Sequence, residues 1–227
     1  MHAEPSKSPW ARRLRRPAAG AGLVLAIAAA TVGALACRVP AFYAERLAAA
    51  ADAEQGARRL VTKAAGVEAA FRRPGRWEAA ISEAEINGFL ATDLPRNHAA
   101  VLPGWLEAPR VALEPHVVTV AARLRAGPLT PVVHAAIELR LIAAGQVQCR
   151  LLRAGLGGVP LPRGLLLHRL AAAARRGGAA AELRRFDGET RLVVTMPRGR
   201  DGATPRLEAL AIGPGEVLLA GTTEAAR

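Results

Sequence analysis

The sequence predicts an α+β fold: a curved antiparallel sheet with packed helices, preceded by one N-terminal transmembrane helix. Three observations predict it. Residues 17–37 carry no charged side chain. Residues 41–71 and 163–176 repeat apolar side chains at spacings of three and four, which marks one face of a helix. From residue 110 onward, several segments alternate apolar and polar residues in the two-residue rhythm of strands.

The charge-free run, PAAGAGLVLAIAAATVGALAC, is 21 residues long. A helix rises about 1.5 Å per residue, so such a run covers roughly 30 Å, the thickness of the bilayer's hydrocarbon core. The preceding segment, residues 1–16, is basic, with Lys7 and four arginines. Because basic flanks stay on the cytoplasmic side, we expect the N-terminus inside and the rest of the chain outside.

Two alternatives to a retained anchor remain open. Ala34-Leu35-Ala36 has the small-x-small form of a signal cleavage site, and Cys37 directly after it is the position that lipoprotein processing modifies. All three routes send residues 41–227 across the membrane. We therefore expect a cell-membrane protein with a membrane-proximal helix over 41–71 and an extracytoplasmic α+β domain over 78–222.

The helix predicted over 41–71 stops at Arg72-Arg73-Pro74-Gly75. Ser82 and Glu85 then form an S-x-x-E capping box, which predicts the start of a short helix. That helix is expected to end before Pro95, because the residue preceding a proline leaves the helical region.

The remaining elements follow in order. Strands are predicted within 110–127 and 132–155, with a turn at 143–146, and a helix over 163–176 ends at Gly177-Gly178. Further strands are predicted near 181–186, 190–196 and 206–212, and a GPGE turn at 213–216 leads to a last strand, 217–222. Short turns between neighbouring strands indicate antiparallel pairing, with helices covering one face.

The chain is strongly basic, with a formal net charge of +12, and almost all of its basic residues are arginine. A general preference for Arg and Ala codons explains this composition as well as a functional attraction to polyanions does. No dense basic stripe is interleaved with aromatic residues, so nucleic acid is not expected as a partner and anionic phospholipid is the favoured polyanion.

No motif selects a reaction. His98, His116 and His134 lack the short spacings typical of metal ligands, and no nucleophile elbow occurs. Cys37 and Cys149 cannot form a disulfide framework, although a single bridge between them is an open alternative. We expect a protein that is not an enzyme and that uses no metal or cofactor.

Trp105 lies in the proline-bounded loop LPGWLEAP, which either folds onto the core or forms a rim that meets lipid or a partner.

Two segments carry a resemblance. ISEAEINGFL (81–90), with Ser82, Glu85, Asn87 and Leu90, and LGGVPLP followed by a helix (156–175), with Gly158, Pro160 and Pro162, resemble the YpmS-like bacterial membrane-anchored proteins. The chain is more distantly similar to the LmeA-like envelope proteins, which bind phospholipids. The resemblance implies an N-terminal anchor, an elongated extracytoplasmic domain with a curved sheet, and a binding role without catalytic residues.

These observations lead to one expected function and one alternative. The expected function is a lipid- or apolar-ligand-binding module of the cell envelope; the alternative is a non-enzymatic interaction or assembly subunit of an envelope complex, with an envelope protein as its partner. An envelope hydrolase, built where His98 or His116 meets an acid, is a third and weaker reading. The candidate ligand-binding residues are Asn87, Phe89, Leu90, Trp105, Pro160, Leu161 and Pro162.

Overall fold

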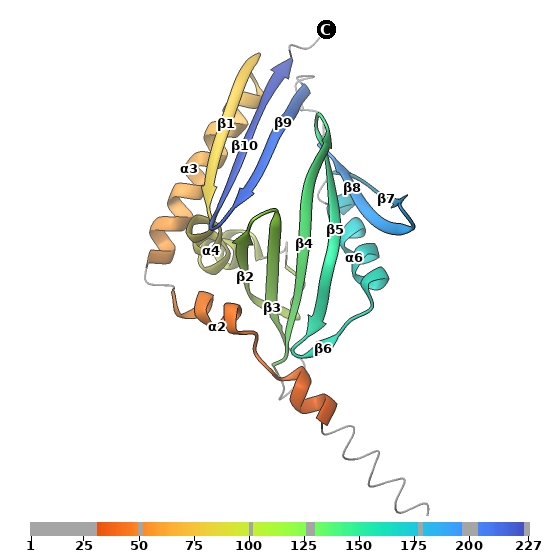
Figure 1. Ribbon diagram of the computed structural model, residues 1–227. Coiled ribbons are helices and arrows are strands. Elements are labelled where there is room, and N and C mark those ends of the chain that lie inside the picture. The colour runs from red at the N-terminus through yellow and green to blue at the C-terminus, as the bar shows by residue number, and fades with distance from the viewer. Residues whose placement is uncertain are drawn as a thin grey trace, which may run out of the picture.

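The computed structural model describes residues 31–49, 52–99, 102–125, 130–176, 179–196 and 204–224. It confirms an α+β architecture of antiparallel sheets and helices (Figure 1). The described helices are α2 (Ala41–Ala48), α3 (Ala53–Phe71), α4 (Glu83–Ala91), α5 (Asp93–Asn97) and α6 (Arg163–Arg176). The strands are β1 (Gly75–Ser82), β2 (Leu106–Glu114), β3 (Val117–Leu124), β4 (Val132–Ala143), β5 (Gln146–Leu156), β6 (Val159–Pro160), β7 (Ala180–Phe186), β8 (Glu189–Thr195), β9 (Thr204–Gly213) and β10 (Glu216–Glu224).

The strands form two sheets where the sequence predicted one. The small sheet has the order β1-β10-β9, and the large sheet has the order β2-β3-β4-β5-β8-β7, with β6 paired to β5. β1 was not predicted at all, because its partner β10 lies far along the chain: Gly75 pairs with Thr223 and Ser82 with Glu216. The hairpin turn predicted at 213–216 is confirmed, and it joins β9 to β10.

The N-terminal region differs from expectation in one respect. The helix predicted over 41–71 is described as two helices, α2 and α3. Residues 31–36 are helical, but most of the predicted span 17–37 lies outside the described residues. Within the described part of the chain, no helix combines the length and apolarity needed to cross a membrane.

The two faces of the large sheet have different covers. α6 packs on one face, where Leu167 and Ala171 join a core with Ala135, Leu151 and Leu192. The opposite face is covered in part by α2, whose Tyr43 is fully buried against Ala121 and Val132 and donates a hydrogen bond to the Ala108 carbonyl at 2.8 Å.

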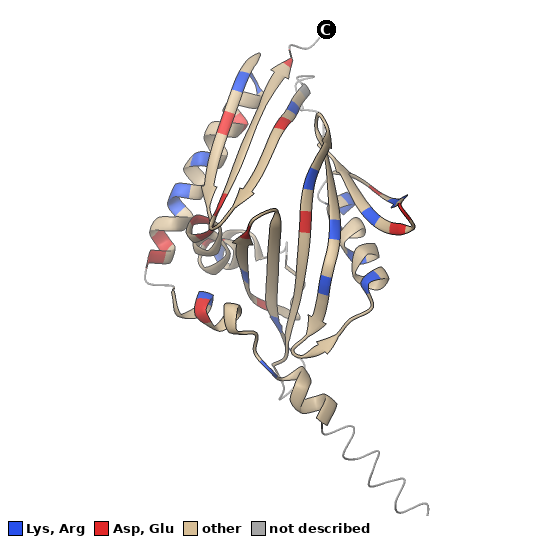
Figure 2. Cartoon of the chain, in the orientation of Figure 1, with Lys and Arg blue, Asp and Glu red and all other residues tan. Residues whose placement is uncertain are grey.

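Farther along that opposite face, charged side chains form a network across strands. Glu138 pairs with Arg140 (2.8 Å), Arg150 pairs with Glu189 (2.7 Å), and Glu189 also lies 3.4 Å from Arg191. Figure 2 shows basic and acidic positions close together on β4 and β5. Both acids of this network have basic partners, and the Arg150–Glu189 pair links β5 to β8.

The short helix at the capping box is confirmed, and its geometry explains how α4 is placed. The Ser82 hydroxyl accepts from the Glu85 backbone N–H at 3.2 Å, and the Glu85 carboxylate accepts from the Ser82 N–H at 2.9 Å. α4 ends at Ala91, before Pro95 as predicted. Pro95 itself lies in the first turn of α5, where a missing N–H costs no helical hydrogen bond.

Candidate functional site

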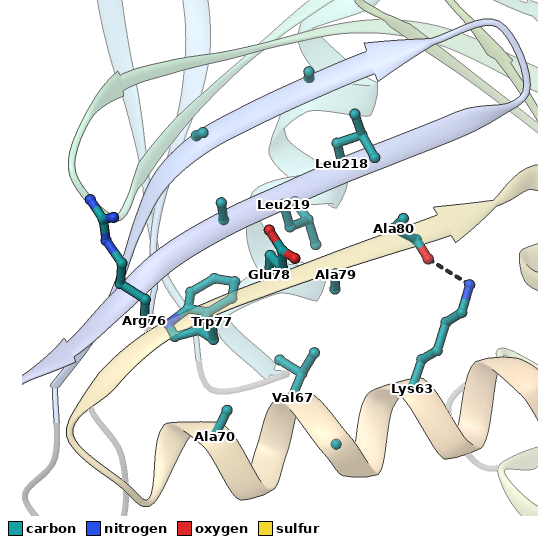
Figure 3. Close-up of a pocket in the computed structure, with 14 residues that line it drawn as sticks. Lys63, Val67, Ala70, Arg76, Trp77, Glu78, Ala79, Ala80, Leu218 and Leu219 are labelled. Atoms are coloured by element: carbon teal, nitrogen blue, oxygen red, sulfur yellow. Dashed lines mark hydrogen bonds between the residues drawn. The ribbon is translucent and has the colours of Figure 1, made fainter.

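A groove of about 850 Å³ lies between α3 and the small sheet (Figure 3). Its lining is mainly alanine, glycine, valine and leucine. The lining residues are Lys63, Gly66, Val67 and Ala70 from α3; Arg76, Trp77, Glu78, Ala79 and Ala80 from β1; and Ala209, Ala211, Leu218, Leu219 and Ala220 from β9 and β10. Its volume lies within the usual range for small-molecule sites.

Small side chains on both walls create this groove. Figure 3 shows Lys63, Val67 and Ala70 pointing from α3 toward β1. Gly66 lies between them on the same helix, and a Cβ built there would meet nothing within 4 Å. One end is closed by Trp77, which is buried and packs edge-to-face on Phe71 with ring centroids 4.9 Å apart. Side chains this small do not fill the space between α3 and the sheet.

Three charged side chains line the groove: Lys63 and Arg76 lie toward its two ends, and the exposed Glu78 lies between them (Figure 3). At one end, the Lys63 ammonium donates to the Ala80 carbonyl at 2.6 Å and to the Glu85 carboxylate at 2.8 Å. At the other end, Arg76 is exposed and has no ion-pair partner among the described residues. The groove is therefore mainly apolar, with the Lys63–Glu85 pair at one end, Arg76 at the other end and the Glu78 carboxylate between them.

The Lys63 end is held together by electrostatics. Glu85 is only 5% exposed, and burial by itself raises the pKa of its carboxyl. Hydrogen bonds from Lys63 and from the Ser82 backbone outweigh burial, so the net pKa of Glu85 is lowered. Glu85 is therefore a carboxylate at neutral pH, and it fixes both the start of α4 and the Lys63 side chain.

The structure places the candidate residues of α4 away from this groove. Asn87 donates to the Val111 carbonyl (2.8 Å) and accepts from the Val111 N–H (2.9 Å), so its amide ties α4 to the edge of β2. Phe89 packs near the His98 ring with centroids 5.8 Å apart, and Leu90 is half-buried. None of the three lines the groove, although Asn87 lines a smaller hollow between the helices.

The other candidates lie on separate elements. Trp105 precedes β2 and is 57% exposed, so it does not fold back onto the core. Pro160 and Leu161 line a hollow beside His134 and Arg153, and Pro162 is exposed just before α6. The seven predicted residues therefore do not converge on one site.

Sequence reasoning missed the groove because it missed β1. The apolar alternation Trp77, Ala79, Ile81 is the signal that could have found this strand. It is short and runs directly into the capping box, so the segment resembles the approach to a helix. The wall formed by Gly66, Val67 and Ala70 gives no distinctive pattern, since small residues at helical spacing are equally typical of close packing.

The described residues include the histidines and cysteines that the sequence analysis considered. They contain no group of three or more His, Cys, Asp or Glu side chains placed to hold a metal ion. His98 lies 3.4 Å from the Asp93 carboxylate on an exposed surface. Cys37 and Cys149 are both free thiols, so the bridge considered between them is not formed.

Comparison with known proteins adds no family. No protein-family model matches the chain, and neither a curated protein nor a solved structure matches it.

Proposed function

We propose that this chain is a membrane-anchored envelope protein, not an enzyme, whose extracytoplasmic domain binds the acyl chain of an anionic amphiphile in the groove between α3 and the small sheet. The observation that carries the proposal is the groove itself, about 850 Å³ in volume and lined mainly by aliphatic side chains. The charge-free run 17–37 supports the anchor, and the resemblance to YpmS-like and LmeA-like proteins supports an envelope role.

The chemistry of the walls favours an acyl chain over a peptide. Alanine, valine and leucine side chains offer an apolar chain contact area without polar partners. A peptide would need hydrogen bonds from the exposed edge of β1. At Ala80 that edge is already occupied, because the Lys63 ammonium donates to its carbonyl. A lysine at a strand edge discourages the addition of another strand.

Arg76, which has no ion-pair partner among the described residues, is the reason to expect an anionic head group. Arg76 lines one end of the groove and is exposed, so it is free to meet an anionic head group. Lys63 is less suited to that task, because the Glu85 carboxylate already neutralises it. The head group is therefore expected at the Arg76 end and the acyl chain along the alanine-rich walls.

Filling the groove tests the proposal. Gly66→Leu places an aliphatic side chain where a Cβ meets open space, so the fold should tolerate it. The full-length protein should bind a fluorescent long-chain fatty acid saturably, and Gly66→Leu should weaken that binding at least tenfold, since the lost burial of several methylenes is worth about 0.8 kcal/mol each.

Gly164→Leu is the matched control, because Gly164 is also a helical glycine with open space around it and lies on α6, outside the groove. It should bind the fatty acid as the unaltered protein does. Equal binding by the unaltered protein and Gly66→Leu, or no saturable binding by either, would contradict the proposal.

A second candidate is an assembly subunit that contacts an envelope protein. The exposed Trp105 favours it, because a tryptophan that is 57% exposed in a proline-bounded loop is typical of a contact surface. A photo-crosslinker at position 105 followed by mass spectrometry separates the candidates. One stoichiometric protein partner supports the assembly role, whereas crosslinks to lipid alone support the binding module.

A further inference from the structure

A second hollow, of about 270 Å³, is lined by residues of α2, the start of α3, α4 and β2. Figure 1 shows how these elements are arranged. Three arginines line it: Arg46, Arg59 and Arg110. It also receives the amide side chain of Asn87 and two carboxylates, Glu83 and Asp52. This hollow is separate from the groove between α3 and the small sheet, with no lining residue in common.

Arg110 is the unusual member of this hollow. The residue is only 7% exposed, yet its only hydrogen bonds in the described structure go to backbone carbonyls. Its Nε donates to the Arg46 carbonyl at 3.4 Å, and its Nη1 donates to the Pro109 carbonyl at 2.7 Å. A guanidinium carries five N–H donors, so further donors remain for a ligand in the hollow that Arg110 lines.

The positive charge of Arg110 has no acidic partner among the described residues. Burial lowers its pKa, the Tyr43 hydroxyl partly offsets that effect, and nearby Arg123 lowers the pKa further. Buried charges in proteins are normally paired, because desolvation of an isolated ion is costly. The other buried or half-buried charges near α4 follow the rule, since Glu85 pairs with Lys63 and Glu83 pairs with Arg46.

The two carboxylates of the lining do not supply the missing charge. Glu83 is committed on both oxygens: one pairs with Arg46, and the other accepts from the Leu113 N–H at 2.7 Å. Asp52 is exposed and forms no ion pair with Arg110. Arg59 is also exposed, and no carboxylate pairs with it in the described part of the chain. Arg110 and Arg59 thus line the hollow without forming an ion pair to either of its carboxylates.

We propose that this hollow binds a phosphate group, held by the buried guanidinium of Arg110 and by Arg59. A phosphate monoester carries close to two negative charges at neutral pH, which matches two arginines better than a single carboxylate does. Asn87 adds a donor, because its amide has two N–H bonds and only one is used on Val111. The source of the phosphate is either a free ion or a phosphorylated head group.

The test is a titration of the full-length protein with inorganic phosphate, followed by calorimetry and by the shift in melting temperature. Saturable one-site binding is expected. Arg59→Gln should weaken it about tenfold, the loss expected for one charge-assisted hydrogen bond. Arg58→Gln is the matched control, because Arg58 is the neighbouring exposed arginine of α3 and lines a different hollow. It should leave the affinity unchanged.

Arg110→Gln should abolish the phosphate-dependent rise in melting temperature. If Arg110→Gln does not fold, Arg59→Gln still tests the proposal. Binding to vesicles that contain phosphatidic acid, compared with binding of glycerol 3-phosphate, identifies the source of the phosphate. Binding of either one supports the site if Arg59→Gln weakens it. Absence of saturable phosphate binding, equal weakening by Arg58→Gln and Arg59→Gln, or acetate binding as tightly as phosphate would each overturn it.

Discussion

Glu85 shows how one side chain links several parts of the fold. Its carboxylate caps α4 through the Ser82 N–H and also holds the Lys63 ammonium of α3. The capping box was predictable from sequence because both of its partners lie within four residues. The bond to Lys63 was not, because it spans 22 positions and depends on how α3 packs.

Replacing Glu85 with Gln should therefore lower stability. The variant leaves the Lys63 ammonium without its carboxylate, at an expected cost of about 1–3 kcal/mol. The measurement is urea unfolding at neutral pH, and Glu78→Gln, a change of an exposed glutamate on β1, is the control with little expected effect. A loss as large for Glu78→Gln would show that the Lys63 contact is not the cause.

The same carboxylate makes stability depend on pH. Because folding lowers the pKa of Glu85, its contribution is present above the usual glutamate pKa of about 4.3 and is lost as the pH falls through the folded value. The unaltered protein should lose stability below that pH more steeply than Glu85→Gln. Urea midpoints measured from neutral to acidic pH check this, and parallel pH profiles would contradict it.

The two cysteines should differ in reactivity. Cys149 packs against the core of the large sheet, and burial raises the pKa of its thiol to about 11, so almost no thiolate forms at neutral pH. Cys37 is exposed. A maleimide should label Cys37 in the folded protein and Cys149 only after denaturation, as read by peptide mass spectrometry. Rapid native labelling of Cys149 would contradict the burial.

At the scale of elements, the crossing of α3 and α4 brings two helix backbones into direct contact. A Cβ on Gly88 would lie 2.5 Å from the Ala53 carbonyl oxygen and 2.8 Å from the Ala57 nitrogen, and a Cβ on Gly56 would lie 2.8 Å from the Ala84 oxygen. The two backbones therefore touch because both crossing residues are glycines. This contact fixes α4 and, through Glu85, one end of the apolar groove.

Gly88→Ala should destabilise the protein by about 1–3 kcal/mol, because the new methyl group meets rigid backbone. Gly66→Ala on α3 should instead stabilise it by up to about 1 kcal/mol, since helix propensity improves and the site is open. Thermal and urea unfolding of both variants measure the difference. A stabilising Gly88→Ala would mean that the two helices lie farther apart than described.

Elements with nearby partners were predictable, and elements with distant partners were not. α6 was predicted at its observed bounds, and the β9–β10 hairpin followed from its turn residues, because helical periodicity and turn chemistry are local. β1 was missed because its pairing with β10 is non-local. For the same reason the groove could not be predicted, since two of its walls depend on that pairing.

At the scale of the whole molecule, two sheets are joined by few backbone bonds. The His116 N–H donates to the Ile212 carbonyl at 3.0 Å, and the Gly145 N–H donates to the Leu207 carbonyl at 2.8 Å. The small sheet has three strands and is covered by α3, whereas β4 and β5 pair over most of their length at the centre of the large sheet. The small sheet therefore has fewer strands than the large sheet that contains β4 and β5.

Hydrogen exchange should separate these two regions. Amides of β9 and β10 are expected to exchange through an opening of lower free energy than the amides of β4 and β5, because fewer strands must separate. Native-state exchange measured by mass spectrometry at several urea concentrations tests this. Identical opening free energies for both sheets would show that they unfold as one cooperative unit.

The pairing of β1 with β10 also sets an order of events during synthesis. β1 ends at Ser82 and its partner begins at Glu216. At about 5–20 residues per second, a newly made β1 waits on the order of ten seconds for the strand that completes its sheet. During that interval Trp77 and the apolar side of α3 have no sheet to bury them. A nascent chain halted before β10 therefore lacks the groove, and it leaves a hydrophobic segment exposed until translation passes residue 224.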